Sequence, residues 1–308
     1  MAVARVRACR AVDREQAAAL FVAAFPLRAG EIETWSGSAR SWRCVAVVGA
    51  PGRVVAYGAV WPFRADGYRM DLVVSPSWRR HGVGSLVLAS EVEQARTLGA
   101  VTLQARAEDG WTDALRFLRA HGFAETMRMH RQVLDVAAAT LGRVAGLESR
   151  LAGEGVRITT LAGELASEPL CWTKFRDVHR AAGDGWVDPD PRPTPDPPMS
   201  SEEFRRTHQR ATAYHGVSLV ECLLAVHGDR YVGFTGVMGT GVHPDYRGRG
   251  IATALKARWI TQARDRGVPT DTTASGNPAM LHINQALGYR LTSTEIRLVK
   301  PLRSITDQ

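Results

Sequence analysis

The sequence is poor in cysteine, which limits the metal and redox sites that it can hold. Four cysteines occur among 308 residues, far apart and without a Cys-x-x-Cys pair or a neighbouring histidine partner: Cys9, Cys44, Cys171 and Cys222. Structural zinc sites and disulfide frameworks both need closely patterned cysteines. We therefore expect free, buried thiols and no bound metal.

Long hydrophobic runs are also missing. No stretch of about 18 apolar residues occurs, and arginines interrupt the first ten residues, where a secretory signal needs an unbroken apolar segment. With 45% hydrophobic and 23% charged residues, the composition is typical of a globular protein. A chain of this length holds about two domains. We expect it to remain in the cytoplasm, as a monomer or homodimer, without a membrane partner.

Lysine is scarce although the chain is basic. The formal net charge is +8, yet lysine occurs only at Lys174, Lys256 and Lys300, and the arginines are scattered rather than gathered in runs. Nucleic-acid-binding surfaces concentrate basic residues, often between aromatic ones. The charge pattern therefore argues against a nucleic-acid partner and favours a small anionic ligand.

The two halves of the chain show the same order of predicted elements. In each, a strand and a helix precede a β-hairpin, a Gly/Arg-rich turn, a long helix, a strand, a short helix and a final strand. We therefore predict a duplicated, mixed α/β fold. The elements used in this comparison lie at residues 3–7, 13–25, 44–48, 54–57, 83–98 and 101–105, and at 156–161, 164–181, 219–226, 231–235, 251–266 and 270–274.

The domain limits follow from this repeat. We place the first domain at residues 1–136 and the second at 155–308, with an Ala/Leu/Arg-rich helix at 137–154 between them. Residues 183–198 hold six prolines and four aspartates, and proline at this density cannot pair in a sheet. A loop of this length in a compact domain is usually functional, so we expect it to border a substrate pocket.

The clearest local pattern joins a strand to a long helix, and it occurs twice. Residues 72–84 read LVVSPSWRRHGVG, and residues 240–252 read TGVHPDYRGRGIA. Proline ends the strand, and glycine lets the backbone turn so that successive N–H groups point into one concavity at the helix N-terminus. Such a turn binds phosphate oxygens, and Arg79 and Arg247 add positive charge. We predict a pyrophosphate-binding turn in each half.

Two other kinds of phosphate-binding loop are excluded by spacing. A P-loop needs Gly-Lys followed by Ser or Thr, which neither turn contains. A dinucleotide-binding turn needs a third glycine, where this sequence has Val87 and Thr253.

The repeated pattern Arg-x-x-Gly-x-Gly/Ala, after a Val-x-Pro strand end and before a long helix, resembles the acetyl-CoA-binding motif of the GNAT superfamily of N-acetyltransferases. The dipeptides Gly122-Phe123 and Gly288-Tyr289 match the next landmark of that family. The resemblance covers nearly the whole chain as two copies, and it implies two GNAT-like acyltransferase domains in tandem.

The resemblance also implies which residues bind acetyl-CoA or another acyl-CoA, without a metal. A main-chain N–H of the strand before the turn would polarise the thioester carbonyl. The acyl group would pass directly to a primary amine, which we expect to belong to a small molecule. The implied binding residues are Val74, Arg79, Arg80, His81, Gly82, Val83 and Gly84 in the first half, and Val242, Arg247, Gly248, Arg249, Gly250, Ile251, Ala252 and Asn277 in the second.

Both halves depart from the family at one position. Many members carry a tyrosine four residues before the Gly-Phe landmark, where its hydroxyl protonates the CoA sulfur; this chain has Leu118 and Asn284 there. Only the asparagine can donate a hydrogen bond, which favours the second half as the active one. That half has only 12 residues from Tyr231 to Val242, so its pocket forms only if residues 236–239 make a tight turn.

Two carboxylates are candidates for the general base that the amine requires. Asp71 lies in the strand before the first turn, and Glu221 lies in an apolar stretch that we assign to a strand. A salt-bridged or outward-facing carboxylate is the alternative for each. Two alternative functions stay open: a catalytically inert CoA-binding sensor or scaffold, and an acetyltransferase acting on a protein N-terminus or lysine.

Overall fold

The computed structural model describes residues 3–26, 40–49, 52–63, 66–183, 199–215, 221–237 and 239–302. It is a mixed α/β structure, as predicted, and it divides into two compact units. Of the described residues, the first unit holds 3–127 and 295–302, and the second holds 128–183, 199–215, 221–237 and 239–294.

The first unit is built on a sheet with the strand order β1-β2-β3-β4-β5, and the second half of β12 pairs with β5 at its edge. All of these pairs are antiparallel except β4 with β5, which are parallel. The strands are β1 (Arg5–Ala8), β2 (Trp42–Val48), β3 (Arg53–Pro62), β4 (Gly67–Val74), β5 (Thr102–Glu108) and β12 (Arg290–Pro301).

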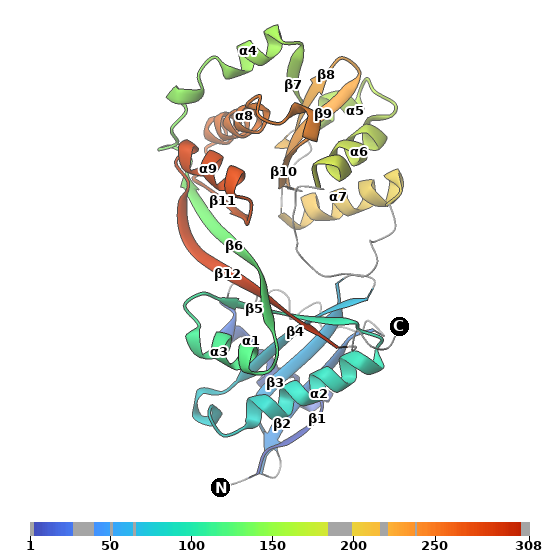
Figure 1. Ribbon diagram of the computed structural model, residues 1–308, viewed down its shortest axis with the longest axis vertical. Helices are drawn as coiled ribbons and strands as arrows, with labels where there is room; N and C mark the ends of the chain where they lie inside the picture. The colour runs from blue at the N-terminus through green and yellow to red at the C-terminus, as the bar shows by residue number, and fades with distance from the viewer. Residues whose placement is uncertain are drawn as a thin grey trace. The chain divides into compact units, whose positions relative to one another are not determined.

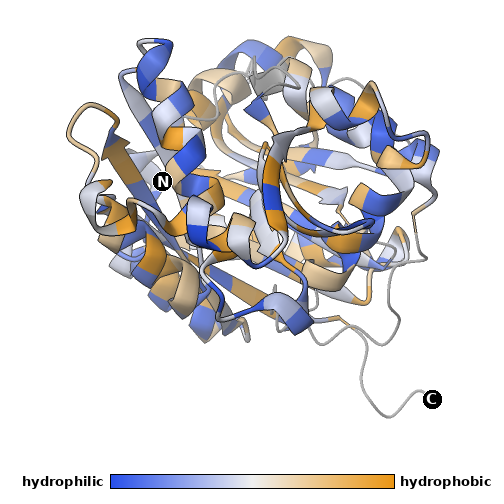
Figure 2. Cartoon of the chain, turned by 90° about the horizontal axis from the view of Figure 1, so that it is seen from above, coloured by the Kyte–Doolittle hydropathy of each residue, from blue (hydrophilic) through white to orange (hydrophobic). Residues whose placement is uncertain are grey.

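Helices cover both faces of this sheet, which is why most of β3 is buried. Helix α1 (Arg14–Ala24) packs Phe21 against Tyr57 on one face. Helix α2 (Val83–Thr97) packs Val87 against Ala56 and Cys44 on the other, and α3 (Thr112–Ala120) adds to the core on that side. In Figure 2 the helices carry alternating hydrophobic and hydrophilic residues, as expected of helices that bury one face.

The second unit contains a four-stranded antiparallel sheet with the order β10-β9-β8-β7. One face packs against α6 and α7, and the other packs against α4 and α8. The elements are α4 (Leu147–Gly153), β7 (Val156–Thr160), α5 (Leu161–Leu165), α6 (Cys171–Gly183), α7 (Ser201–His215), β8 (Leu223–His227), β9 (Arg230–Gly236), β10 (Gly239–Val242) and α8 (Ile251–Asp265).

A second strand pair of this unit lies beside α8 and the short helix α9 (Pro278–Leu287). Strand β11 (Thr270–Ser275) pairs antiparallel with residues 130–135 of β6 (Ala124–Asp135). The 12-residue strands β6 and β12 are long enough, at about 3.3 Å per residue, to run from one unit into the other (Figure 1). The final strand of each half thus ends in the other unit; the domain limits at residues 136 and 155 stay a prediction.

Among the described residues, the predicted elements differ from the structure in three places. The linking helix predicted at 137–154 is α-helical only at α4 (Leu147–Gly153), which follows a 3-10 turn at Gly142–Val144. The helix predicted at 164–181 is two helices, α5 and α6, because Pro169 lies between them and lacks the N–H that would continue the first. Of the strand predicted at 219–226, residues 219 and 220 lie outside the described residues, and the strand begins at Leu223, after Glu221 and Cys222. The tight turn of the second half is confirmed, since Gly239 pairs with Gly236 in an antiparallel hairpin.

Candidate active site

The first candidate turn lies between β4 and α2. After Val74 the chain makes a single 3-10 turn at Pro76–Trp78, and Gly82 then precedes α2 in the left-handed conformation, with φ +76°. No side chain caps this helix, and a Cβ built on Gly82 would meet nothing within 4 Å. The first N–H groups of α2 have no partner inside the helix, so the turn offers them to a ligand.

The second turn, between β10 and α8, repeats this geometry. Gly250 precedes the helix with φ +84°, and the residue two positions earlier is also left-handed in both turns, with φ +64° at Arg80 and +78° at Gly248. Each arginine at the start of the turn folds back on its strand: Nε of Arg79 and of Arg247 donates to the carbonyl of Val74 and of Val242, each at 3.3 Å. The two turns are therefore equivalent structures.

The turns differ in what covers them. Helix α4 packs against the second turn, where a Cβ on Gly250 would lie 3.1 Å from the Leu147 side chain. Arg150, also on α4, donates through Nη2 to the Arg249 carbonyl at 2.9 Å. No local sequence pattern indicates this contact, because Arg150 and Arg249 lie 99 residues apart in the chain. A third guanidinium group thus stands beside Arg247 and Arg249.

The other side chains of the predicted CoA set have different roles. Val83 and Ile251 are buried in the core below each turn. His81 bonds through Nδ1 with the Arg79 carbonyl at 2.7 Å, and Arg249 lies 4.9 Å from the Tyr246 ring centroid. Main-chain groups and the arginines of this set remain available to meet a phosphate.

The strands before both turns also present free edges. Strand β5 pairs with β4 only at Gly67–Arg69. Among the described residues, the later part of β4, up to Val74, therefore pairs with β3 alone and has no strand on its other side. Strand β10, which carries Val242, is the last strand of its sheet. Main-chain groups of both strands can therefore pair with an extended ligand.

Asn284 is fully buried in α9, and its Nδ2 donates to Oε1 of Gln132 on β6 at 2.7 Å. The donor that a role in protonating sulfur would use is thus already engaged. Asn277 caps α9, since its Oδ1 accepts from the N–H groups of Ala279 and Met280. The catalytic role of Asn284 and the binding role of Asn277 stay predictions.

The two candidate bases have different surroundings. Glu221 precedes β8 and forms an ion pair with Arg266, with 3.3 Å between Oε1 and Nη1. Asp71 is buried in β4 and stands opposite Ala59 of β3. Ala59 in turn stands opposite Arg43 of β2, so Arg43, Ala59 and Asp71 form one row across the α1 face of the sheet.

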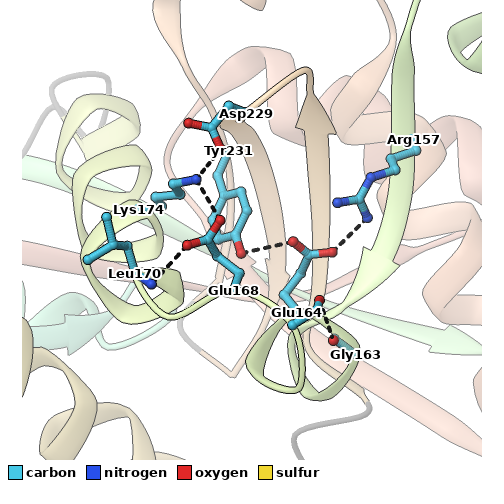
Figure 3. A network of polar contacts seen from close by, with 9 residues as sticks. Arg157, Gly163, Glu164, Glu168, Leu170, Lys174, Asp229 and Tyr231 are labelled. Carbon is cyan, nitrogen blue, oxygen red and sulfur yellow. Dashed lines mark hydrogen bonds and ion pairs between the residues drawn. The ribbon is translucent and has the colours of Figure 1, made fainter.

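A polar network lies on the α5–α6 side of the second unit (Figure 3). Glu164 is buried and accepts hydrogen bonds from Tyr231 at 2.9 Å and from Arg157 at 2.6 Å. Burial alone would raise the pKa of Glu164, but the bonds from Arg157 and Tyr231 outweigh it and lower the pKa. Nearby, Lys174 bonds both Glu168 and Asp229.

We expect Glu164→Gln to destabilise the second unit by about 1 to 2 kcal/mol at neutral pH, because the charge-assisted bond is lost. A carboxyl whose pKa is lower in the folded than in the unfolded protein stabilises the folded state at pH values above the unfolded pKa. This stabilisation is lost as the pH falls through the folded pKa. The difference in the free energy of unfolding between wild type and variant should therefore become smaller as the pH falls. Urea unfolding of both proteins at several pH values measures this difference, and a difference that grows in acid would contradict the lowered pKa of Glu164.

Among the described residues, no group of three or more His, Cys, Asp or Glu side chains gathers as a metal site. None of the helices described is long and apolar enough to cross a membrane. Cys44, Cys171 and Cys222 are buried free thiols, as predicted, whereas Cys9 is only half-buried.

Comparison with known proteins gives a consistent result. Residues 41–125 match the family model described as "Acetyltransferase (GNAT) domain", and residues 175–289 match that described as "Acetyltransferase (GNAT) family". Mycothiol acetyltransferase from Cellulomonas flavigena is 24% identical over 269 residues, which cover 83% of this chain and 74% of that protein. The L-amino acid N-acyltransferase MnaT from Escherichia coli is 43% identical, but only over 54 residues, 17% of this chain and 31% of that enzyme.

Solved structures show the same fold over the whole chain. A GCN5-related N-acetyltransferase from Sphaerobacter thermophilus superposes with a TM-score of 0.71 at 19% identity, covering 99% of this chain and 98% of that one. A tandem GNAT protein from the clavulanic acid biosynthesis pathway gives 0.62 at 19% identity, covering 98% and 99%. The chain therefore belongs to the GNAT family of acetyltransferases and carries two of its domains in tandem, as the repeated motif predicted.

Proposed function

We propose that the protein transfers an acetyl or related acyl group from CoA to the primary amine of a small molecule. The observation that carries this proposal is the equivalence of the two turns. In each, a left-handed glycine precedes a 15-residue helix, and an arginine is bonded back to the last strand residue. A turn of this kind binds phosphate through main-chain N–H groups and the positive end of the helix.

The residues of both turns fit the diphosphate of CoA. The open space beside Gly82 and Gly248 lets phosphate oxygens approach the backbone. Arg79 and Arg247 neutralise the negative charge of the diphosphate, and Arg150 provides a further positive charge in the second half. The free edges of β4 and β10 would pair with the amide-containing arm of CoA, as an added strand pairs with a sheet edge.

Bound acetyl-CoA supplies an acyl group as a thioester. The amine nitrogen attacks the thioester carbonyl, so a C–N bond forms and the C–S bond breaks. The amine must first lose a proton, and Asp71 or Glu221 would accept it directly or through water. The departing thiolate must gain a proton, and main-chain N–H groups of the strand before the turn would stabilise the negative charge on the carbonyl oxygen.

Two contacts favour a second candidate function, a CoA-binding protein without turnover. Nδ2 of Asn284 is bonded to Gln132, and Glu221 is paired with Arg266. In the second half, both candidate groups are thus already engaged by another side chain. Asp71, the other candidate base, lies buried in β4 of the first unit, which makes the first half a candidate for the reaction as well.

Release of free CoA from acetyl-CoA, measured with a panel of primary amines, separates the two functions. We expect at least one small amine to raise release clearly above the hydrolysis background and to gain one acetyl group by mass. CoA binding without release across the panel would reject the transferase and support the inert function. Acceptance of peptide amines alone would instead point to a protein substrate.

A further inference from the structure

The first unit contains a pocket that the CoA-binding turn does not use. It lies where β1 leads into α1 and β2 begins, at the opposite end of these antiparallel strands from the level of Val74. Its volume is about 310 Å³, at the lower end of the range for small-ligand sites. It is lined by Ala8, Cys9, Arg10, Ala11, Arg14, Ser41, Trp42 and Arg43.

The pocket is positively charged. Among the described residues, Arg10, Arg14 and Arg43 line it and no acidic residue does. Two acids, Asp13 and Glu15, adjoin Arg14 along the chain, and neither lines the pocket. Asp13 is held by Arg7 through two bonds of 2.5 and 2.8 Å, which lower the pKa of Asp13 and keep it ionised. In the described part of the chain, Arg10 and Arg14 form no ion pair. Guanidinium groups bind carboxylate and phosphate through paired N–H donors.

The pocket is connected to the candidate base Asp71 through the row of residues across the sheet. Arg43, which lines the pocket, and Asp71 flank Ala59 on the face that α1 covers. Because neighbouring strands lie about 4.8 Å apart, the Cα atoms of Arg43 and Asp71 are separated by about 10 Å. A small molecule that carries an anionic group and an amine can place its anionic group among the arginines of the pocket and extend its amine toward the Asp71 carboxylate.

We infer that this pocket binds the anionic group of the acceptor of the first half, and that this acceptor is a small amine carrying a carboxylate or a phosphate. The acceptor role rests on the proposed function, whereas binding of the anion does not. Two independent measurements therefore test the two parts.

Cys9 provides the binding measurement, because it lines the pocket and the other three cysteines are buried. The rate of Cys9 alkylation by N-ethylmaleimide, followed by peptide mass spectrometry, should fall when succinate or inorganic phosphate is added at millimolar concentration. Succinate and phosphate distinguish a carboxylate site from a phosphate site. For each protein, the alkylation rate with the anion is divided by the rate without it, and these ratios are compared between wild type and variants. The ratio is needed because the charge of Arg14 lowers the pKa of Cys9, so that loss of Arg14 changes the alkylation rate even without an anion.

Arg14→Met should raise the anion concentration for half-protection at least tenfold. Arg5→Met is the matched control, because Arg5 is exposed on β1, does not line the pocket, and its loss changes the net charge equally. Protection that Arg14→Met weakens and Arg5→Met preserves supports the site. Absence of protection by both anions, or equal weakening in both variants, overturns it.

The acceptor role is tested by turnover with β-alanine, O-phosphoethanolamine and propylamine. We expect one of the two anionic amines to exceed propylamine in kcat/KM at least tenfold, and Arg14→Met or Gly82→Asp to remove this advantage. Equal turnover of all three amines, or an advantage that survives in Arg14→Met, overturns the acceptor role. No turnover at all, with Cys9 still protected, overturns the proposed function and the acceptor role and leaves the anion site in place.

Discussion

Gly82→Asp should lower the affinity of the first turn for CoA at least tenfold. The residue precedes α2 at φ +76°, where a side chain meets nothing within 4 Å, so the new carboxylate points into the open turn. Two unit charges 4 Å apart repel by about 4 kcal/mol at an effective dielectric constant of about 20. One third of that repulsion against a bound phosphate already corresponds to about a tenfold loss.

Gly82→Asn is the matched control, since asparagine has the same shape and both residues tolerate the left-handed conformation. Both also favour a helix N-cap, so neither variant should unfold α2. Isothermal titration with CoA compares the two. If wild type, Gly82→Asp and Gly82→Asn bind CoA with equal affinity, the first turn does not bind the phosphates of CoA.

The corresponding change at the second turn should have a smaller effect. Arg150 Nη2 lies 3.4 Å from the position of a Cβ on Gly250, so it can pair with an introduced carboxylate. Leu147 lies 3.1 Å from the same position and would have to move for either side chain. We therefore expect Gly250→Asp and Gly250→Asn to differ less than the two Gly82 variants. Adding Arg150→Met to Gly250→Asp should restore the full charge effect.

The turns were predictable from sequence because their chemistry is local. Proline after a strand and glycine before a helix restrict the backbone within a few residues, and both turns have the predicted form. The hairpin before the second turn was predictable for the same reason, because only a tight turn fits between Tyr231 and Val242. Pro169, which separates α5 from α6, is an equally local signal that the helical periodicity around it obscured.

Contacts between distant segments were not predictable. The packing of Leu147 and Arg150 against Gly250 depends on where α4 lies, which no local pattern reveals. The strands β6 and β12 follow the expected order, but the sequence does not show that each ends in the other unit. Side-chain direction was equally hidden: Asn284 was predicted from its distance to a glycine, yet its amide faces Gln132 in the core.

A buried carboxyl in the first unit leads to the second large effect. Glu91 on α2 is 0% exposed and faces Gly58, where a Cβ would lie 2.8 Å from its Oε1. Within the part of the chain that the structure describes, neither carboxyl oxygen has a partner at full hydrogen-bond geometry, although the Ala59 N–H is close enough to act on its pKa. Burial raises the pKa of Glu91 well above its usual 4.5; the Ala59 N–H opposes this rise and the charge of Asp71 adds to it. The folded state therefore holds Glu91 in its neutral form.

Because the unfolded chain ionises Glu91 above about pH 4.5 and the folded chain does not, stability should fall as pH rises from that value toward the folded pKa. Each pH unit in this range lowers the free energy of unfolding by about 1.4 kcal/mol. We expect Glu91→Met, which keeps a similar volume without a charge, to stabilise the first unit by about 2 kcal/mol or more at neutral pH, increasingly so toward alkaline pH.

Hydrogen exchange of peptides from α2 and β3 is the suitable measurement, because a chain of two units need not unfold in one step. Slower exchange in Glu91→Met than in wild type at pH 8, with a smaller difference at pH 5, is the expected result. Glu91→Gln retains a buried polar group but cannot ionise, so it should lose the pH dependence while gaining less stability. A stabilisation by Glu91→Met that does not change with pH would show that Glu91 has the same protonation state in the folded and unfolded chain.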